Sequence, residues 1–193
     1  KRNNPEKPKR TYTVGSLYAG IGGICMGFQE GGVKVLWANE FDKNACITYR
    51  TNFTHKLYEQ DIHTLDPKDV PQVDILTSGF PCQAFSIAGY QKGFKDSRGN
   101  HFFETLKFIQ HLKPKAILLE NVKNLMSHDK GNTFRVIKDF ILNSGYSFIT
   151  KVLNTKDYGN IPQNRERIFM IGFRDEDYHD DFTMNQTAIC SQN

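Results

Sequence analysis

The chain has 193 residues, of which 38% are hydrophobic, and its formal net charge at pH 7 is +4. This length is enough to bury one sizeable core, and because no long apolar run interrupts the sequence, we expect a single soluble domain without a membrane span. The first residues lack the apolar stretch of a secretory signal, and the four cysteines show neither metal-ligand spacing nor a dense disulfide framework, so we expect reduced thiols in a cytoplasm.

The positive charge is concentrated at the start of the chain. Residues 1–10 contain five basic side chains and one glutamate, a surplus that equals the whole net charge, so residues 11–193 are formally neutral. A basic, proline-containing segment is typical of disorder, and it could either contact phosphates or serve only as a solubilising leader. We therefore expect a disordered leader over 1–10 and one folded domain over 11–175.

Apolar runs and helical patterns alternate along the rest of the chain. Strands are predicted at 13–17, 33–39, 73–78, 116–120, 146–154 and 167–173, and helices near 25–30, 43–52, 100–112 and 132–143. This alternation is typical of an α/β, Rossmann-like fold, in which a mostly parallel sheet carries helices on both faces. No helix separates the last two strands, so we expect them to pair as an antiparallel hairpin at one edge.

A glycine-rich segment follows the first predicted strand and leads into the first helix. Small residues let a ligand approach the backbone there, and the helix N-terminus presents free N–H groups. The spacing departs from the dinucleotide pattern, because Cys25 occupies the position of the third glycine. Glu40, after the second strand, can accept hydrogen bonds from both hydroxyls of a ribose. These features suit S-adenosylmethionine, with candidate contacts from Tyr18, Ala19, Gly20, Gly22 and Gly23.

Cys82 comes directly after Pro81, at the end of the strand predicted at 73–78. Ligands of open α/β sheets bind in the crevice at the carboxyl ends of the strands, and Cys82 is placed there as a candidate nucleophile. The alternative is that Cys82 is a small hydrophobic residue in the core.

Charged residues accompany two further strands. Glu120 emerges from the strand at 116–120, where desolvation would raise its pKa and allow it to donate a proton. Arg165 and Arg167 lead into the last strand, and arginine suits an anionic or carbonyl-bearing target. A helix-capping glutamate and a solvated charge cluster are the alternatives. The six histidines are scattered without metal spacing, so we expect no metal site.

Taken together, the motifs Pro81-Cys82-Gln83, Glu120-Asn121-Val122 and Gln163 through Arg167 resemble the catalytic motifs of bacterial DNA (cytosine-5) methyltransferases. The resemblance covers Thr13 to about Arg174, and it includes the glycine-rich segment and residues 39–42, 91–99 and 154–161. Several motifs in one order are far more specific than a single motif. The resemblance implies the S-adenosylmethionine-dependent methyltransferase fold, S-adenosylmethionine as cofactor and double-stranded DNA as partner.

The family resemblance also implies roles for cofactor-binding residues. Phe41 would stack on the adenine, and Asp61, next to Ile62, would accept a hydrogen bond from the adenine amino group; Pro81 would border the cofactor. An ordinary strand-end turn at Asp61 is equally compatible with the sequence. The family carries an aspartate at the position of Ser16, so this chain lacks one expected carboxylate, and we expect weaker cofactor binding than in a relative that has it.

The implied chemistry is methylation of C5 of cytosine through a covalent adduct. Cys82 would add to C6, Glu120 would contact N3 and the exocyclic amine, and Arg167 and Arg165 would bind the ring carbonyl or hold Glu120. The target base must first leave the DNA helix. The candidate contacts to the flipped nucleotide and its DNA are Gln83, Ser86, Arg98 and Asn121, the first three within a segment over 80–99 that we expect to be a mobile loop.

A target-recognition region follows the arginine motif in this family, and residues 176–193 would begin the linker toward it. A truncated protein, one subunit of a split enzyme completed by a complementing chain, and a degenerate relative are the three explanations; we favour a part that needs the rest of the enzyme, in a restriction-modification system. A non-catalytic cofactor- or DNA-binding module is the alternative function, and methylation of RNA is a third. The cellular location expected is the bacterial or phage-infected cytoplasm, on the nucleoid.

Overall fold

A computed structural model describes residues 11–82, 101–159 and 161–174. Its centre is a seven-stranded sheet in the order β3-β2-β1-β4-β5-β7-β6. The strands are β1 (Thr13–Leu17), β2 (Lys34–Asn39), β3 (Lys56–Tyr58), β4 (Ile75–Ser78), β5 (Ala116–Val122), β6 (Ile149–Asn154) and β7 (Glu166–Phe173). The neighbours from β3 to β5 pair in parallel, whereas β7 pairs antiparallel with both β5 and β6. The predicted fold class, including the antiparallel hairpin at the edge, is therefore confirmed.

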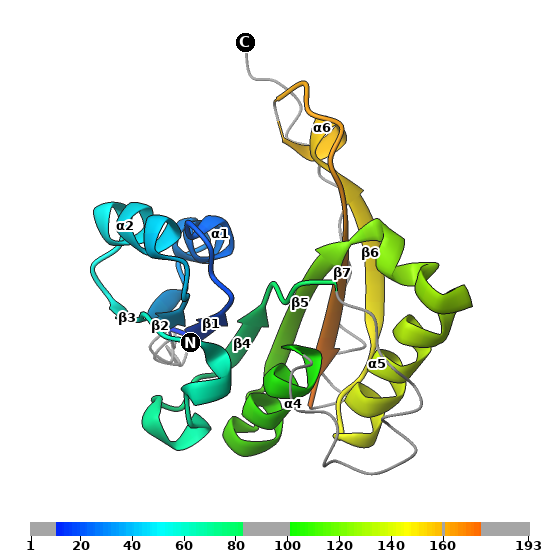
Figure 1. Ribbon diagram of the computed structural model, residues 1–193, viewed down its shortest axis with the longest axis horizontal. Coiled ribbons are helices and arrows are strands. Elements are labelled where there is room, and N and C mark those ends of the chain that lie inside the picture. The colour runs from blue at the N-terminus through cyan, green and yellow to red at the C-terminus, as the bar shows by residue number, and fades with distance from the viewer. Residues whose placement is uncertain (1–10, 83–100, 160, 175–193) are drawn as a thin grey trace, which may run out of the picture.

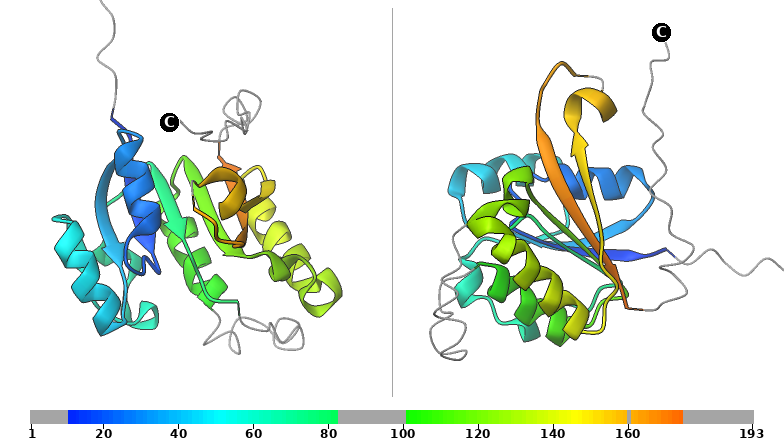
Figure 2. Two further views of the ribbon diagram at one scale, coloured as in Figure 1. Left: turned by 90° about the horizontal axis from the view of Figure 1, so that it is seen from above. Right: turned by 90° about the vertical axis from the view of Figure 1, so that its right-hand side faces the viewer.

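Helices cover both faces of this sheet. The α-helices are α1 (Gly23–Glu30), α2 (Lys43–Asn52), α4 (His101–Leu112), α5 (Asn132–Asn143) and the short α6 (Thr155–Tyr158), and the 3-10 helices are η1 (Ile62–Thr64), η2 (Pro67–Asp69), η3 (Lys123–Met126) and η4 (His128–Gly131). Figure 2 shows α1 and α2 on one face and α4 and α5 on the other. In Figure 1, α6 and the adjoining ends of β6 and β7 project beyond the rest of the sheet.

Two apolar clusters follow from this layering. The smaller one joins α1 and α2 to β1 and β2 and contains Val14, Cys25, Val35, Ala38, Tyr49 and Phe53. The larger one packs α4 and α5 against the opposite face and contains Trp37, Leu76, Phe102, Ile117, Ile137 and Ile168 among others. Because strand residues alternate between faces, β1 and β2 contribute to both clusters, and this part of the sheet is buried on both sides.

The predicted helices agree with the observed ones to within two residues, and the strands differ more. The strand predicted from 73 begins at Ile75, because the Asp74 carboxylate accepts hydrogen bonds from the Thr13 backbone and hydroxyl at 3.1 and 3.0 Å and pairs with Lys115. The strand predicted from 146 begins at Ile149, after Tyr146 has anchored its hydroxyl on the Pro114 carbonyl. The three-residue β3 was not predicted, and neither was the four-residue α6, which lies between β6 and β7 where we expected no helix.

The chain crosses from one side of β1 to the other between β3 and β4, so the sheet has a switch point between β1 and β4. Loops after β1 and β4 diverge there and leave a crevice at the carboxyl ends of the strands. No helix in the described part of the chain is long and apolar enough to span a membrane. The leader over 1–10 and the linker over 176–193 lie outside the described residues and stay predictions.

Candidate active site

The segment after β1 forms a tight turn that ends at the start of α1. Tyr18, Gly20 and Gly22 have positive φ angles of 53°, 57° and 100°. The turn is closed by a hydrogen bond from the Gly22 amide to the Ala19 carbonyl at 3.0 Å, and no side chain caps the N-terminus of α1, which begins at Gly23. The backbone N–H groups of the first turn are therefore directed toward the crevice without a side-chain partner.

Glu40 fixes this turn from the end of β2. One carboxylate oxygen accepts the Gly20 amide at 2.8 Å, and the other accepts the amides of Phe41 and Asp42 at 2.8 and 2.9 Å. The residue is only 8% exposed. A carboxylate offers about four acceptor positions, so three are used on the backbone and a position remains for a ribose hydroxyl.

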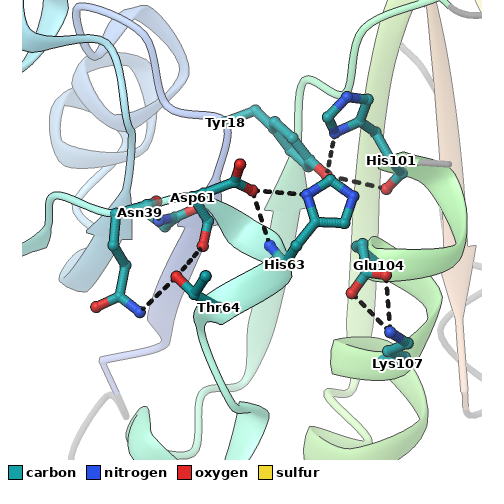
Figure 3. Close-up of polar contacts among 9 residues, drawn as sticks. Tyr18, Asn39, Asp61, His63, Thr64, His101, Glu104 and Lys107 are labelled. Atoms are coloured by element: carbon teal, nitrogen blue, oxygen red, sulfur yellow. Dashed lines mark hydrogen bonds and ion pairs between the residues drawn. The ribbon is translucent and has the colours of Figure 1, made fainter. Parts of the chain in front are cut away.

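The remaining predicted cofactor residues lie around the neighbouring strand ends. The Phe41 ring is 66% exposed, as a stacking surface for a planar ligand requires, whereas Ile62 is buried in the core. Asp61 caps η1 by accepting the His63 amide, so the strand-end turn is present. The Tyr18 hydroxyl donates to the His101 carbonyl at 3.0 Å and also contacts the imidazole of His101 (Figure 3).

A cavity of about 550 Å³ opens between the glycine turn and the ends of β5, β6 and β7. Six predicted site residues line it: Tyr18, Ala19, Gly23, Glu120, Arg165 and Arg167. Nine further lining residues had no predicted role: Ile21, Ile24, Gly79, Leu153, Asn154, Thr155, Tyr158, Gly159 and Phe169. The lining does not include Gly20, Gly22, Glu40, Phe41, Asp61, Ile62, Pro81, Cys82 or Asn121, which lie on the surrounding turns and strand ends.

Glu120 and Arg167 form an ion pair at one wall of the cavity. The Arg167 Nε atom lies 3.0 Å from the Glu120 Oε1 atom, and each side chain is 21% exposed. The pairing register places Glu120 opposite Phe169 and Val122 opposite Arg167, so the ion pair is a diagonal contact across β5 and β7 on one face of the sheet. Burial raises the pKa of Glu120, and Arg167 and then Arg165 oppose that rise. The carboxyl group is thus suited to hold or release a proton.

Arg165 is placed by a side chain that sequence reasoning missed. The Asn154 side-chain Oδ1 atom accepts a hydrogen bond from the Arg165 backbone amide at 3.1 Å, and the Asn154 Nδ2 atom donates to the Asn164 Oδ1 atom at 2.7 Å. The Thr155 amide also donates to the Arg165 carbonyl at 3.0 Å. Asn154 lies within the family-like segment 154–161, which was the only sequence signal for it.

Cys82 leaves the sheet from β4 through an anchored connection. Phe80 is 3% exposed and packs on Phe102, with 5.7 Å between ring centroids, whereas Pro81 and Cys82 are exposed. Cys82 is a free cysteine, and because it is exposed it is not the small hydrophobic core residue of the alternative interpretation. Gln83, Ser86 and Arg98, and nearly all of the predicted loop, lie outside the described residues.

Adjacent residues of β5 hold this connection. The Asn121 side chain donates to the Phe80 carbonyl at 2.8 Å and accepts the Val122 amide at 2.8 Å. A Cβ atom added to Gly79 would lie 3.7 Å from Glu120 Oε2 and 3.5 Å from the Tyr18 carbonyl, so the β4 exit passes directly beside the carboxyl group. Asn121, which we expected to contact DNA, is 3% exposed, and its side chain is used on the backbone that precedes Cys82.

Ser16 is buried in β1, beside Thr77 of β4. It is 1% exposed, and its hydroxyl accepts a hydrogen bond from the Thr77 hydroxyl at 2.9 Å. Within residues 11–82, 101–159 and 161–174, no group of three or more His, Cys, Asp or Glu side chains could hold a metal ion.

Comparison with known proteins places this geometry in a family. Residues 12–192 match the model of the C-5 cytosine-specific DNA methylase family. The chain is 54% identical over 171 residues to the type II methyltransferase M.Bsp6I of Bacillus sp. (strain RFL6), covering 88% of this chain and 54% of that protein. It is 50% identical over 160 residues to the type II methyltransferase M.HhaI of Haemophilus parahaemolyticus, covering 83% and 48%. The chain thus spans about half the length of these relatives.

Solved structures share the fold at lower identity. The S. pombe Dnmt2 methyltransferase is similar with a TM-score of 0.64 at 24% identity, covering 84% of this chain and 49% of that one. The Entamoeba histolytica methyltransferase EhMeth has a TM-score of 0.66 at 18% identity, covering 86% and 54%. On the family model and the relatives, the chain belongs to the C-5 cytosine-specific DNA methylase family.

Proposed function

We propose that this chain is the cofactor-binding and catalytic part of an enzyme that transfers a methyl group from S-adenosylmethionine to C5 of cytosine in double-stranded DNA. The observation that carries the proposal is the half-buried Glu120–Arg167 pair beside the β4 exit, from which Cys82 emerges as an exposed thiol. An acid on β5, its cationic partner on β7 and a nucleophile in the segment that follows β4 are the groups that this chemistry needs.

The reaction begins when the Cys82 thiolate forms a bond to C6 of the cytosine. Glu120 protonates or hydrogen-bonds N3, which draws electrons into the ring, and Arg167 keeps the carboxyl group in position. S-adenosylmethionine, held beside the glycine turn and Glu40, would supply the methyl group to the electron pair at C5, and S-adenosylhomocysteine would be the leaving group. Loss of the C5 proton to water, return of the N3 proton to Glu120 and cleavage of the C6–sulfur bond then release 5-methylcytosine and the thiolate.

The glycine turn, Glu40 and the exposed Phe41 ring support binding of S-adenosylmethionine. In this proposal the backbone amides at the start of α1 and the remaining acceptor position of Glu40 hold the polar part of the cofactor. Phe41 stacks on the adenine, and Asp61 accepts a hydrogen bond from its amino group. When bound, the cofactor supplies the electrophilic methyl group.

Asn121 has a positioning role in this scheme. Because its side chain is buried against the Phe80 carbonyl, we assign it to the support of the Cys82 segment instead of direct DNA contact. Gln83, Ser86 and Arg98 stay the candidate contacts to the extruded nucleotide, and Arg165 a second cation near its carbonyl.

The chain spans about half of its relatives, so we propose that activity on DNA needs the remaining half, in the same polypeptide or as a complementing chain. Both relatives are named type II methyltransferases, which supports a place in a restriction-modification system inside the bacterial cytoplasm. The alternative is a non-catalytic module that binds the cofactor or DNA.

The test is covalent trapping on DNA that contains 5-fluorocytosine, with S-adenosylmethionine present, for the chain with and without the C-terminal part of a relative. We expect a denaturation-resistant adduct that Cys82→Ser abolishes while cofactor binding, measured by calorimetry, is retained. The buried Cys46 provides the matched control, Cys46→Ser, which should still form the adduct. Cofactor binding without an adduct under any condition would favour the non-catalytic module.

A further inference from the structure

A row of polar side chains begins at the carboxyl ends of β1 and β3, beside the proposed cofactor residues, and continues to the start of α4. The Asp61 Oδ1 atom accepts two hydrogen bonds from one residue, His63: its amide at 2.9 Å and its Nδ1 atom at 2.6 Å. The His63 ring lies 5.2 Å from the His101 ring, and His101 contacts the Tyr18 hydroxyl (Figure 3).

The hydrogen bonds among these side chains determine which of their atoms carry hydrogens. An ionised carboxylate only accepts, so His63 Nδ1 must carry a hydrogen. Burial raises the pKa of Tyr18, so its hydroxyl keeps its one hydrogen, which goes to the His101 carbonyl. His101 Nδ1, at 3.2 Å from the same hydroxyl, must then donate to it. Both imidazoles therefore present Nδ1–H as a donor.

The two bonds from His63 give Asp61 a defined orientation. His63 occupies Oδ1, and no group in the described part of the chain donates a hydrogen bond to Oδ2. The Asp61 side chain is 55% exposed, so this oxygen is accessible from solvent. The hydrogen bonds from His63 lower the pKa of Asp61, which keeps the carboxylate ionised and acceptor-only at neutral pH.

We propose that His63 is a positioning residue for cofactor recognition: its imidazole holds the Asp61 carboxylate so that Oδ2 accepts a hydrogen bond from the 6-amino group of the cofactor's adenine. This inference rests on the proposed function, and it assigns the discrimination between a 6-amino and a 6-oxo purine to the Asp61–His63 pair. A 6-oxo group offers a second acceptor to the carboxylate and is disfavoured.

His101 and Tyr18 complete the arrangement from α4 and the glycine turn. The burial of His101 and then the nearness of His63 lower the pKa of His101, so His101 stays neutral and keeps its Nδ1–H for Tyr18. The buried Glu104, one helical turn along α4, is paired with Lys107 at 2.7 and 2.8 Å. Among these groups of the described chain, only His63 donates hydrogen bonds to the Asp61 carboxylate.

The test is calorimetric binding of S-adenosylhomocysteine and of its 6-oxo (inosine) analogue to the chain and its variants. We expect His63→Ala to weaken binding of the 6-amino ligand about 5- to 10-fold, the net worth of one ordinary hydrogen bond, and to change binding of the 6-oxo ligand less. His63→Asn should restore discrimination, because its side-chain N–H lies close to the position of Nδ1. The exposed His111 provides the control, His111→Ala, which should bind as the unaltered chain does.

The outcomes separate this inference from the function on which it rests. If the unaltered chain binds neither ligand, the proposed cofactor site itself is wrong. If it binds and discriminates, but His63→Ala weakens both ligands equally or leaves discrimination unchanged, only the role of His63 is overturned. Thermal unfolding of each variant identifies a loss that comes from misfolding, and in that case His63→Asn alone decides.

Discussion

The glycine turn allows steric strain and backbone strain to be measured separately. A Cβ atom at Gly23 would meet nothing within 4 Å, and Gly23 has no positive φ. Gly20 also has open space, but its φ is +57°. At Gly22 φ is +100°, and a Cβ atom would overlap the Phe53 ring. Alanine therefore introduces neither kind of strain at position 23, backbone strain alone at position 20, and both backbone and steric strain at position 22.

The expected losses of stability follow from these environments. Gly23→Ala should be neutral or stabilise by up to about 1 kcal/mol, because it only restricts the unfolded chain. Gly20→Ala should cost about 1–2 kcal/mol for a left-handed backbone. Gly22→Ala adds about 1–3 kcal/mol of overpacking, because Phe53 is 6% exposed and stacks on Tyr49 at 4.5 Å between ring centroids, so its ring cannot swing aside.

Urea denaturation of the three variants measures the series. The free energy of unfolding should fall in the order Gly23→Ala, Gly20→Ala, Gly22→Ala, and Phe53→Leu should reduce the difference between the last two by relieving the overlap. If Gly22→Ala is no less stable than Gly20→Ala, or if Phe53→Leu leaves their difference unchanged, the packing of the turn against Phe53 is not what restricts position 22.

Three further predictions concern Glu120 and Asn121 of β5 and Cys82 after β4. Asn121→Ala should lower the free energy of unfolding by about 2–3 kcal/mol, because it leaves the buried Phe80 carbonyl without a hydrogen bond. The control Asn124→Ala, at an exposed neighbour, should change the free energy of unfolding by less than about 0.5 kcal/mol. Equal effects of the two substitutions in urea denaturation would contradict the anchoring role of Asn121. Burial raises the pKa of Glu120 in the folded state above the ordinary glutamate value of 4.5. The stability that this shift contributes is present below 4.5 and is lost as the pH rises through the raised pKa, so the unaltered chain should lose stability relative to Glu120→Gln as the pH rises above 4.5. The opposite trend in unfolding free energies would refute the desolvation argument. In a Cys190→Ser variant, a thiol reagent should label Cys82 of the native chain at least about 10-fold faster than the buried Cys25 and Cys46. Peptide mapping would measure the three labelling rates, and comparable rates would contradict the exposure of Cys82.

The sequence was sufficient for the fold because local and global signals agree in this chain. Short apolar stretches, separated by helical patterns, identified every strand except β3, whose three residues, Lys56–Tyr58, carry too short a pattern. The antiparallel pairing of β6 with β7 was expected from the short connection between them, whereas the order of the strands in the sheet was not predicted.

The sequence predicted the charged side chains that pair at the cavity, and it did not predict the residues whose role depends on contact with a distant part of the chain. Glu120 and Arg167 were expected together and form an ion pair. The roles of Asn154 and Gly79 depend on partners 11 and 41 residues away along the chain, Arg165 and Glu120, which no local pattern reveals. Asn121 was assigned to DNA because its chemistry permits it, but strand alternation turns it to the buried face.

The opposite orientations of Glu120 and Asn121 have a consequence for how this enzyme class can vary. One strand presents the acid to the cavity and, one residue later, fastens the segment that carries the thiol on the reverse side. A one-residue insertion or deletion in β5 ahead of Glu120 would exchange the two faces, and both the Glu120–Arg167 pair and the support of the Phe80 carbonyl would be lost at once. The placement of the carboxyl group and the anchoring of the Cys82 segment are thus coupled through neighbouring residues of one strand.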